Sequence, residues 1–223
     1  MKHTLPELSY AFNALEPYFD HETMIIHHSR HHQAYVDNLN KAISGSAAEN
    51  QGLENILHEI SKHPAVVRNN AGGHYNHSLF WQILSPTASH TPKNELAEKI
   101  DLTFGSLENL KSEIKAAGIA QFGSGWAWLS VDNKGGLVVT ATPNQDNPLM
   151  DVVSTDRMLP ILGVDVWEHA YTLNIRTKER TTWMLFGRYW IGLRSKEIIC
   201  KQFQTLNNNF LTEPSSWLYL PAS

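Results

Sequence analysis

The chain has 223 residues, which suffice for one large domain or two small ones with a substantial buried core. Apolar residues, aromatic ones included, make up 42% and charged residues 18%, a composition typical of globular and not of disordered proteins. The net charge of −4 offers no basic surface for nucleic acid, and no window holds the roughly 18 apolar residues of a membrane helix. We therefore expect neither a nucleic acid nor a membrane as a partner.

A cytoplasmic location is expected from the cysteine content and the opening residues. The single cysteine, Cys200, excludes an internal disulfide framework and suits a reducing compartment. Residues 1–20 contain no continuous apolar stretch and no small-residue cleavage site, so no signal peptide is expected.

The N-terminal half is predicted to be helical. Asp20 is a suitable N-cap for a first helix, and the acid Glu22 in its first turn suits the positive end of the helix dipole. Apolar residues at helical spacing continue over 24–40, and the small, polar residues 45–52 predict a loop. A second helical stretch is expected over 53–84.

Two consecutive glycines, Gly72 and Gly73, interrupt that second stretch. Each glycine inside a helix costs about 1 kcal/mol relative to alanine. Such glycines usually mark the close approach of another backbone or of a bulky group. We therefore expect this part of the helix to be buried against another segment.

The C-terminal half is predicted to mix helices and strands. Residues 85–93 have the Pro and Ser content of a linker, and two helices are expected after it, over 94–104 and 106–119. Two β-type runs, 126–131 and 137–141, flank an Asp/Asn/Gly turn and predict a hairpin. A third run, over 158–167, is expected to complete the sheet.

The predicted fold class is α+β, with two domains. We expect a helical N-terminal domain over residues 1–88 and an α/β domain with a small antiparallel sheet over 93–200. Residues 207–223 are expected to form a disordered tail.

Twelve histidines are the unusual feature of the composition. In the first helix His27, His31 and Tyr35 stand at i, i+4 and i+8, so they share one face. His28 and His32 form a second row one residue further round. A buried imidazole needs polar partners for both nitrogens, so such a face is costly in a core unless the rings are used. By itself, this segment is equally compatible with a solvated face.

Two further segments carry the same chemistry. His74 and His77 stand at i and i+3 on the second helix, and for this pair alone a structural role is favoured. Asp165 precedes His169 by four residues, where the third β-type run ends. This carboxylate and imidazole form either a helix cap with a hydrogen-bonded histidine or a pair of metal ligands.

Taken together, the three segments predict a metal site. Neutral imidazoles with one carboxylate and no cysteine suit a first-row metal ion such as manganese, iron or zinc. The lack of sulfur ligands argues against a closed structural zinc site. Large aromatic residues flank the segments and would limit the access of water. They are Tyr35, Trp81, Trp126, Trp128 and Trp167.

The order of the motifs resembles that of one family. Five segments are similar to successive signatures of the iron/manganese superoxide dismutases: HHSRHHQAYVDNLN, NNAGGHYNHSLFW, QFGSGWAWL, TPNQDNPLM and VDVWEHAY. The resemblance covers residues 1–171 and implies an α-helical hairpin followed by an α/β domain, with the metal ion between them. The implied activity is the disproportionation of superoxide to dioxygen and hydrogen peroxide at a mononuclear site.

The resemblance also assigns roles to individual residues. The implied metal ligands are His27, His77, Asp165 and His169. These leave a fifth position for water or hydroxide. His31 and Tyr35 match the pair at the substrate funnel that delivers a proton, and Gln145 matches the glutamine that hydrogen-bonds the metal-bound solvent.

Other matches concern the surroundings of the metal. Trp126 and Trp167 match the apolar walls of the pocket. Glu168 matches a residue that reaches the ligand histidine of the partner subunit, which implies a homodimer. We interpret the remaining histidines of the three segments as structural; they are His28, His32 and His74.

Manganese is expected in preference to iron, with one ion in each subunit. Gln145 in the NQD motif, combined with Gly73 in GGHYNH, resembles the manganese-type arrangement. In the iron type a glutamine usually comes from the second helix instead. The intrinsic affinity of a site for each metal rarely decides which metal it binds in cells. Iron is therefore the alternative.

Two other classes of protein use similar donor sets. A non-haem iron oxygenase also has His and carboxylate ligands, but it needs open positions for a co-substrate, whereas four protein ligands leave one. A non-catalytic metal-binding or storage protein has no need of a Tyr35 and a Gln145 placed to handle protons. A superoxide-scavenging assay separates these alternatives from a dismutase.

The chain departs from the family pattern after Tyr171. The family usually continues as YLKYQN-R--DY---FW----W, whereas this chain continues as TLNIRTKERTTWMLFGRYWIG. A nucleotide sequence can be written that encodes YLKYQNKRADYMDAFWKVLDW. When its first base is removed, the shifted reading frame encodes the segment present here. Our hypothesis is a one-nucleotide slip in the coding sequence, which makes residues 176–223 atypical and the protein as written weakly active or unstable. The alternative is a genuinely divergent C-terminus.

Overall fold

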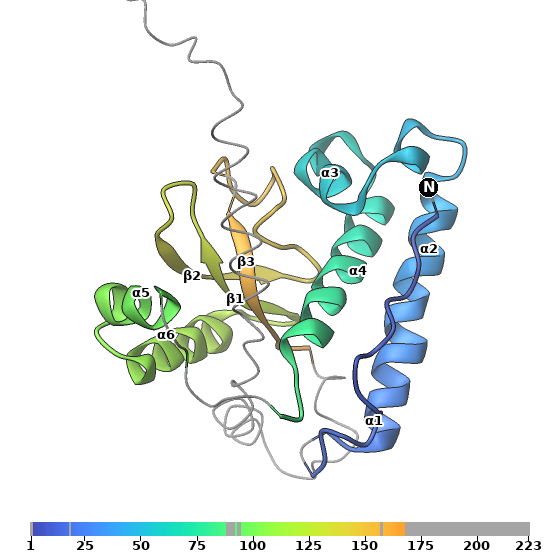
Figure 1. Ribbon diagram of the computed structural model, residues 1–223. Helices are drawn as coiled ribbons and strands as arrows, with labels where there is room; N and C mark the ends of the chain where they lie inside the picture. The colour runs from blue at the N-terminus through green and yellow to red at the C-terminus, as the bar shows by residue number, and fades with distance from the viewer. Residues whose placement is uncertain (1, 18, 88–91, 93–94, 157, 168–223) are drawn as a thin grey trace, which may run out of the picture.

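The structure is a computed structural model, and it describes residues 2–17, 19–87, 92, 95–156 and 158–167. Figure 1 shows a helical N-terminal half beside a small sheet with two further helices. The helical segments of the first half are α1 (His21–Ile25), η1 (Ile26–His32), α2 (Gln33–Ile43), η2 (Ala47–Asn50), α3 (Leu53–His58), η3 (Ile60–Lys62) and α4 (Ala65–Ile83). The second half contains α5 (Glu95–Phe104), α6 (Leu107–Ala120), β1 (Gly125–Val131), β2 (Leu137–Pro143) and β3 (Leu159–Asp165).

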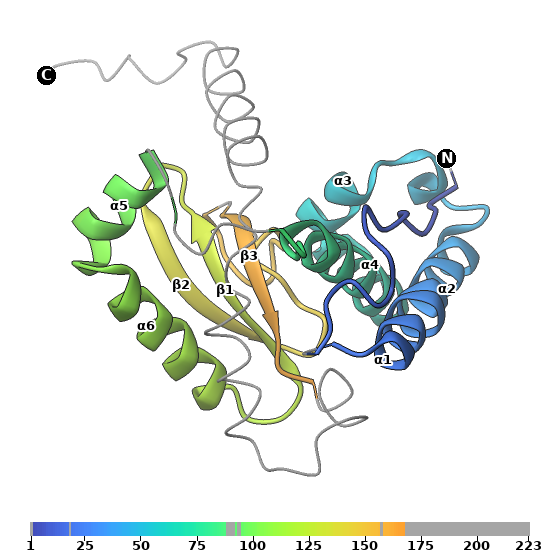
Figure 2. The same ribbon diagram turned by 60° about the horizontal axis from the view of Figure 1, so that its bottom comes forward.

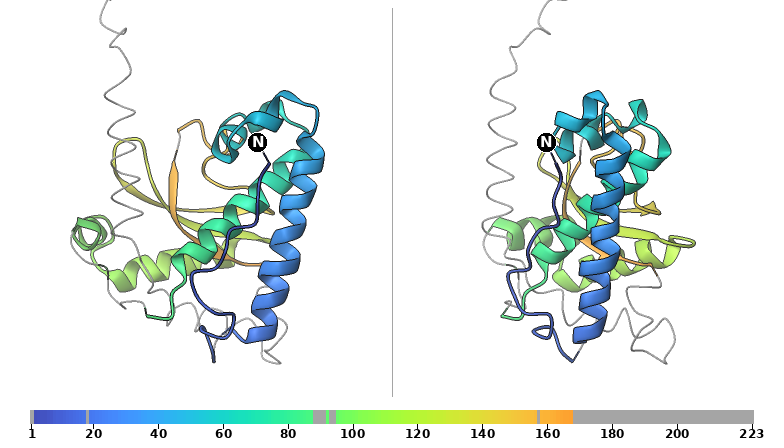
Figure 3. Two further views of the ribbon diagram at one scale, coloured as in Figure 1. Left: turned by 45° about the vertical axis from the view of Figure 1, so that its right-hand side comes forward. Right: turned by 90° about the vertical axis from the view of Figure 1, so that its right-hand side faces the viewer.

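The first helix is a continuous rod made of α1, η1 and α2, and it lies beside α4 (Figure 3). The predicted N-cap is confirmed, because Asp20 Oδ1 accepts a hydrogen bond from the backbone N–H of Thr23 at 2.9 Å. The middle of the rod, η1, is a π-helix, which the sequence pattern did not predict. Such wider turns occur frequently at functional sites, and η1 carries the first histidine segment.

The prediction of one helical stretch over residues 53–84 is wrong. The helix α3 ends at His58, and after the short turn η3 a new helix begins at Ala65. Pro64 stands at the N-cap of α4, where its lack of an N–H group does no harm, whereas inside a helix it would remove a hydrogen bond. The predicted loop over 45–52 also contains the helical turn η2.

The helix α4 runs between the first helix and the sheet (Figure 1). Four consecutive residues of α4, from His74 to His77, are all buried. A helix that is enclosed on all sides has no need of a polar face, which explains why its apolar pattern is weak. The histidine segment of α4 therefore lies in the interior of the described part of the molecule.

The sheet is antiparallel, with the strand order β2-β1-β3. The predicted hairpin between β1 and β2 is confirmed, and Asp132 Oδ1 closes its turn by accepting from the backbone N–H groups of Lys134 and Gly136. The central strand β1 is buried over its whole length. On β3, Pro160 lies beside the register irregularity next to Ser130, where a ladder hydrogen bond can be spared.

Two helices, α5 and α6, lie on the opposite side of the sheet from α4, as Figure 2 shows. Both agree with the predicted helices to within about one residue at each end. Ser106 caps α6, because its Oγ accepts from the backbone N–H of Asn109 at 3.1 Å. The sheet is thus enclosed between two helical layers.

The predicted fold class is confirmed: an α-helical hairpin is followed by an α/β domain with a three-stranded antiparallel sheet. Within the described residues, no helix is long and apolar enough to span a membrane. The predicted disordered tail, 207–223, and the atypical segment, 176–223, lie outside the described residues.

Candidate metal centre

Three of the predicted metal ligands lie together in the interior. His27 comes from η1, His77 from α4 and Asp165 from the end of β3, and all three are buried. Their potential ligand atoms lie within 4.8 Å of one another. The Oδ2 atom of Asp165 is 3.3 Å from His27 Nε2 and 3.9 Å from His77 Nε2. The fourth predicted ligand, His169, lies outside the described residues, as does Glu168.

Local hydrogen bonds direct two of these side chains toward the shared centre. The Nδ1 atom of His77 donates to the backbone carbonyl of Gly73 at 2.7 Å, so the lone pair of the neutral ring is on Nε2. The Oδ1 atom of Asp165 accepts from the backbone N–H of Trp167 at 2.9 Å, while Oδ2 faces the imidazoles. This is the orientation that a bound metal ion requires, and two imidazoles with a carboxylate suit manganese or iron.

Gln145 links the strands to the first helix beside this centre. Its Nε2 donates to the hydroxyl of Tyr35 at 3.0 Å, and its Oε1 accepts from Trp126 Nε1 at 3.2 Å. Asn76, which immediately precedes the predicted ligand His77, donates to the backbone carbonyl of Gln145 at 3.1 Å. The amide of Gln145 is therefore held in one orientation at the edge of the centre.

Tyr35 and His31 each pack beside one of the predicted ligands and are more exposed than those ligands. His31 is exposed and Tyr35 is half-buried, and the ring of Tyr35 lies 5.3 Å from that of His77. Burial raises the pKa of Tyr35 to about 12, and the nearby carboxylate of Asp165 adds to this effect. The phenol is therefore protonated at neutral pH. Because its oxygen accepts from Gln145, its own hydrogen is available for donation.

Residues 2–85 match the sequence model of the alpha-hairpin domain of the iron/manganese superoxide dismutases, and residues 92–185 match that of the C-terminal domain. The chain belongs to the iron/manganese superoxide dismutase family. Proteins of this family bind manganese or iron, and the buried group of two histidines and one aspartate agrees with that. The second match runs to residue 185 and so extends beyond Tyr171.

Aromatic rings enclose the centre of this dismutase-family chain. Trp126 packs edge-on against His77 with ring centroids 5.3 Å apart, and it stacks on Trp128 at the same separation. Trp126 also pairs with Asp165 in the sheet register, so the two side chains lie on the same face of the sheet. Trp167 is half-buried, and its Nε1 donates to the backbone carbonyl of Asn144 at 3.1 Å. These rings limit the access of water to the buried ligands.

The predicted close approach at the two glycines is confirmed. A Cβ atom on Gly73 would lie 2.6 Å from two ring carbons of Tyr35. A Cβ atom on Gly72 would overlap the backbone carbonyl of Gln145. The pair of glycines thus allows α4 to touch both the tyrosine and the glutamine beside the centre.

We expect Gly73→Ala to lower the free energy of unfolding by about 1–3 kcal/mol, because the new methyl group displaces the Tyr35 ring. Urea unfolding of metal-free protein measures this. In a Tyr35→Ala background the obstacle is gone, so the same substitution should become neutral or stabilise, by up to about 1 kcal/mol. An equal loss in both backgrounds would contradict the contact.

Several residues that hold the Gln145 loop were missed by the sequence analysis. Arg68 donates to both carboxylate oxygens of Asp146, from Nε at 2.8 Å and from Nη2 at 2.6 Å. Asn147 Nδ2 donates to Asn76 Oδ1 at 2.8 Å. Asn76, Asp146 and Asn147 lie inside two of the recognised motifs, which was a usable signal, whereas nothing in the sequence marked Arg68.

The other histidines of the segments are buried and hydrogen-bonded, which supports their interpretation as structural. His28 Nε2 donates to the backbone carbonyl of Pro6 at 2.9 Å, and His32 Nε2 lies 2.8 Å from His74 Nδ1. Burial, with the neighbouring histidines as a second cause, lowers the pKa of His32 to about 2. Burial also lowers the pKa of His74 to about 4, with His3 as a smaller cause. Both rings are therefore neutral at physiological pH.

Proposed function

We propose that this protein is a superoxide dismutase, which converts superoxide to dioxygen and hydrogen peroxide at one manganese or iron ion in each subunit. The observation that most strongly supports this proposal is that His27, His77 and Asp165 converge beside the hydrogen-bonded pair Tyr35 and Gln145. Family membership supports the same reaction. A superoxide-scavenging assay on manganese-loaded and iron-loaded protein tests it, and no activity with either metal, at full loading, would reject it.

The proposed ligands are His27, His77, Asp165 and His169. When bound, the ion supplies one-electron chemistry, which two successive superoxide ions require. The chain holds the ligand atoms together without a thiolate and surrounds them with Trp126 and Trp81, so that water has little access.

Protons are the second requirement, because hydrogen peroxide leaves only after superoxide has gained two of them. We assign delivery of one proton to Tyr35, whose hydroxyl is protonated at neutral pH. The exposed His31 lies on the solvent side of the buried His27, with ring centroids 6.4 Å apart. Because His31 and Tyr35 resemble the proton-delivering pair of the family, we assign to His31 the transfer of a proton from solvent to Tyr35.

We expect Gln145→Leu to lower turnover by about 10–100-fold at unchanged metal content, the range typical of residues just outside a ligand set. The leucine side chain is apolar and one heavy atom smaller, and it loses the hydrogen bonds to Tyr35 and Trp126. Pulse radiolysis with metal analysis of the same samples measures the effect. Equal turnover in variant and parent, at equal metal content, would remove Gln145 from the mechanism.

Tyr35→Phe should have a milder effect, visible mainly at high superoxide flux, because proton delivery then limits the release of peroxide. The ring that packs against His77 is kept, and only the hydroxyl is lost. Comparison of initial rates at low and high superoxide concentration measures this. A uniform loss at all concentrations would indicate damage to the centre instead of slower protonation.

We propose manganese as the preferred metal. The glutamine beside the centre comes from the loop after β2, and Gly73 on α4 has no room for a side chain because the Tyr35 ring fills that space. An iron-type glutamine at Gly73 would therefore collide with Tyr35. Higher activity of the iron-loaded than of the manganese-loaded protein would contradict this choice. We also propose that the protein is a homodimer, because Glu168 resembles the residue that reaches the ligand histidine of the partner subunit. We further propose a cytoplasmic location, because a single cysteine suits a reducing compartment.

A further inference from the structure

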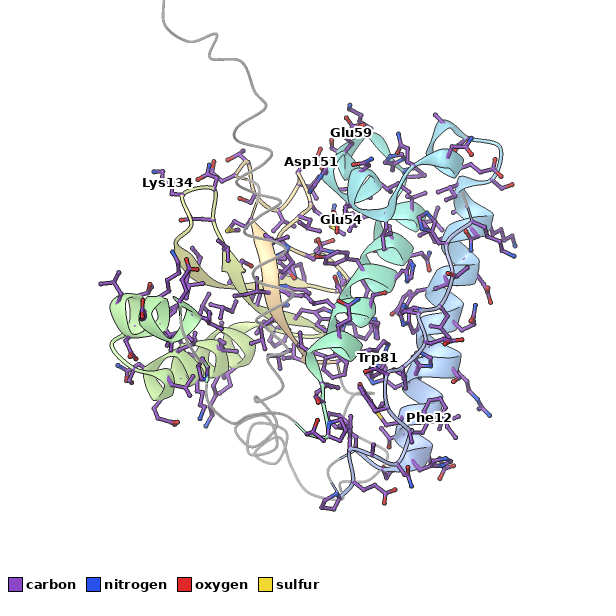
Figure 4. The ribbon with its side chains drawn as sticks, in the orientation of Figure 1. Phe12, Glu54, Glu59, Trp81, Lys134 and Asp151 are labelled. Atoms are coloured by element: carbon purple, nitrogen blue, oxygen red, sulfur yellow. The ribbon has the colours of Figure 1, made fainter. Side chains whose placement is uncertain are left out.

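Trp81 connects a histidine outside the proposed ligand set with one inside it. Figure 4 shows its side chain at the lower end of α4, toward the N-terminal helix. Its Nε1 donates to His32 Nδ1 at 2.9 Å. Its ring packs edge-on against His27, with centroids 5.0 Å apart and planes at 80°. The position of the indole thus links His32 to His27.

The donor and acceptor of each hydrogen bond among Trp81, His32 and His74 follow from which ring nitrogens can carry a hydrogen. An indole N–H can only donate, so His32 Nδ1 must be the acceptor. The neutral ring of His32 then carries its hydrogen on Nε2, which donates to His74 Nδ1 at 2.8 Å. Reversal of either bond would leave two hydrogens or two lone pairs facing each other. The order of donation is therefore from Trp81 to His32 to His74.

His32 also contacts the second helical ligand directly. Its ring lies 5.5 Å from that of His77, tilted by 34°, and it is fully buried at 0% exposure. The imidazole of His32 therefore packs directly against His77 and contacts His27 indirectly, through the indole of Trp81. Both contacts join the first helix to α4.

We propose that His32 is a positioning residue: it sets the orientation of the His27 imidazole through its acceptor bond with Trp81, and that of the His77 imidazole through direct ring packing. This inference rests on the metal centre of the proposed function. A neutral histidine suits the role because its two ring nitrogens accept and donate in one plane, so that Trp81 and His74 are both satisfied. The loss of the acceptor would leave a buried indole N–H unsatisfied and free the ring to move.

Two substitutions separate the nitrogens of His32. In His32→Asn the amide oxygen can replace Nδ1 and still accept from Trp81, whereas in His32→Gln the polar end reaches the Nε2 position instead. We expect the affinity for Co²⁺, measured by visible absorption titration of the metal-stripped full chain, to fall about 10–100-fold in His32→Gln. In His32→Asn it should stay within about threefold of the parent, and the cobalt bands should keep their positions.

Trp81→Phe provides the matched control, because it removes the indole N–H while it keeps a ring against His27. In this background the difference between the two His32 variants should vanish. Equal Co²⁺ affinities of His32→Asn and His32→Gln at equal thermal stability would overturn the proposal, because a purely structural role does not distinguish the two nitrogens.

A metal-free measurement keeps this test separate from that of the dismutase activity. Long-range ¹⁵N–¹H correlation spectra of histidine-labelled protein report which ring nitrogen carries the hydrogen. We expect the Nε2–H form for His32, and the Nδ1–H form would overturn the proposal. If the parent bound no Co²⁺, the metal centre itself would be rejected together with this role. Failure of superoxide scavenging with intact Co²⁺ binding would reject only the proposed reaction.

Discussion

His77→Ala is expected to abolish metal binding, with the metal content falling from one ion per subunit to less than about a tenth of that, and activity falling below detection. His77 is fully buried, its Nδ1 is occupied by the Gly73 carbonyl, and its Nε2 faces Asp165. No other side chain of the described part of α4 joins that group of ligand atoms. Metal analysis of purified protein and the scavenging assay measure both losses.

The stability of the same variant distinguishes a lost ligand from a damaged fold. A ligand that binds only the folded state stabilises it by about 2.7 kcal/mol when the free ligand concentration is 100 times the dissociation constant. Parent and variant should therefore differ in Tm when metal is present, and the difference should shrink after metal is removed with a chelator. His21→Ala, at an exposed histidine, serves as the control and should keep the metal. Full metal content in His77→Ala would show that the ligand was chosen wrongly.

Restoration of one base directly after the Tyr171 codon is expected to raise both stability and activity substantially. On the one-nucleotide hypothesis, the restored frame encodes YLKYQNKRADYMDAFWKVLDW in place of TLNIRTKERTTWMLFGRYWIG. The apolar and aromatic residues of the family pattern would then be available for packing. Their recovery should add several kcal/mol, compared with a total stability of about 5–15 kcal/mol for ordinary domains.

A gain of that size corresponds to a rise in Tm of about 5–15 °C for a chain of this length. Sequencing of the gene comes first, followed by thermal unfolding and activity of the restored protein beside the original one. As a control, a silent change at the same codon should leave both properties unaltered. An early stop codon in the restored frame, or unchanged Tm and activity, would favour a genuinely divergent C-terminus instead.

The local elements could be predicted well because their signals are short-range. The cap at Asp20 and the β1–β2 hairpin each depend on residues a few positions apart, and both are present. The prediction of one helical stretch over residues 53–84 failed around Pro64. Inside a helix Pro64 would remove a hydrogen bond, so α4 begins directly after it, although the apolar pattern continues through this position.

The candidate site was predictable in composition but not in arrangement. Helical spacing indicated that His27 and His31 share a face, and His74 and His77 likewise, but it did not say which of the histidines meet. The choice of His27, His77 and Asp165 came from the family resemblance. Their convergence depends on how the first helix, α4 and β3 pack, and packing involves residues far apart in the chain.

By itself, the sequence determined the fold class, the family resemblance and a donor set of imidazoles with one carboxylate, because residue type and local spacing carry that information. Only the tertiary structure decided which partners support the site. Arg68 meets Asp146 across 78 positions, and Trp81 meets His32 across 49. Such contacts are fixed by the register in which α4 packs against its neighbours, and the periodicity of one helix contains nothing about that register.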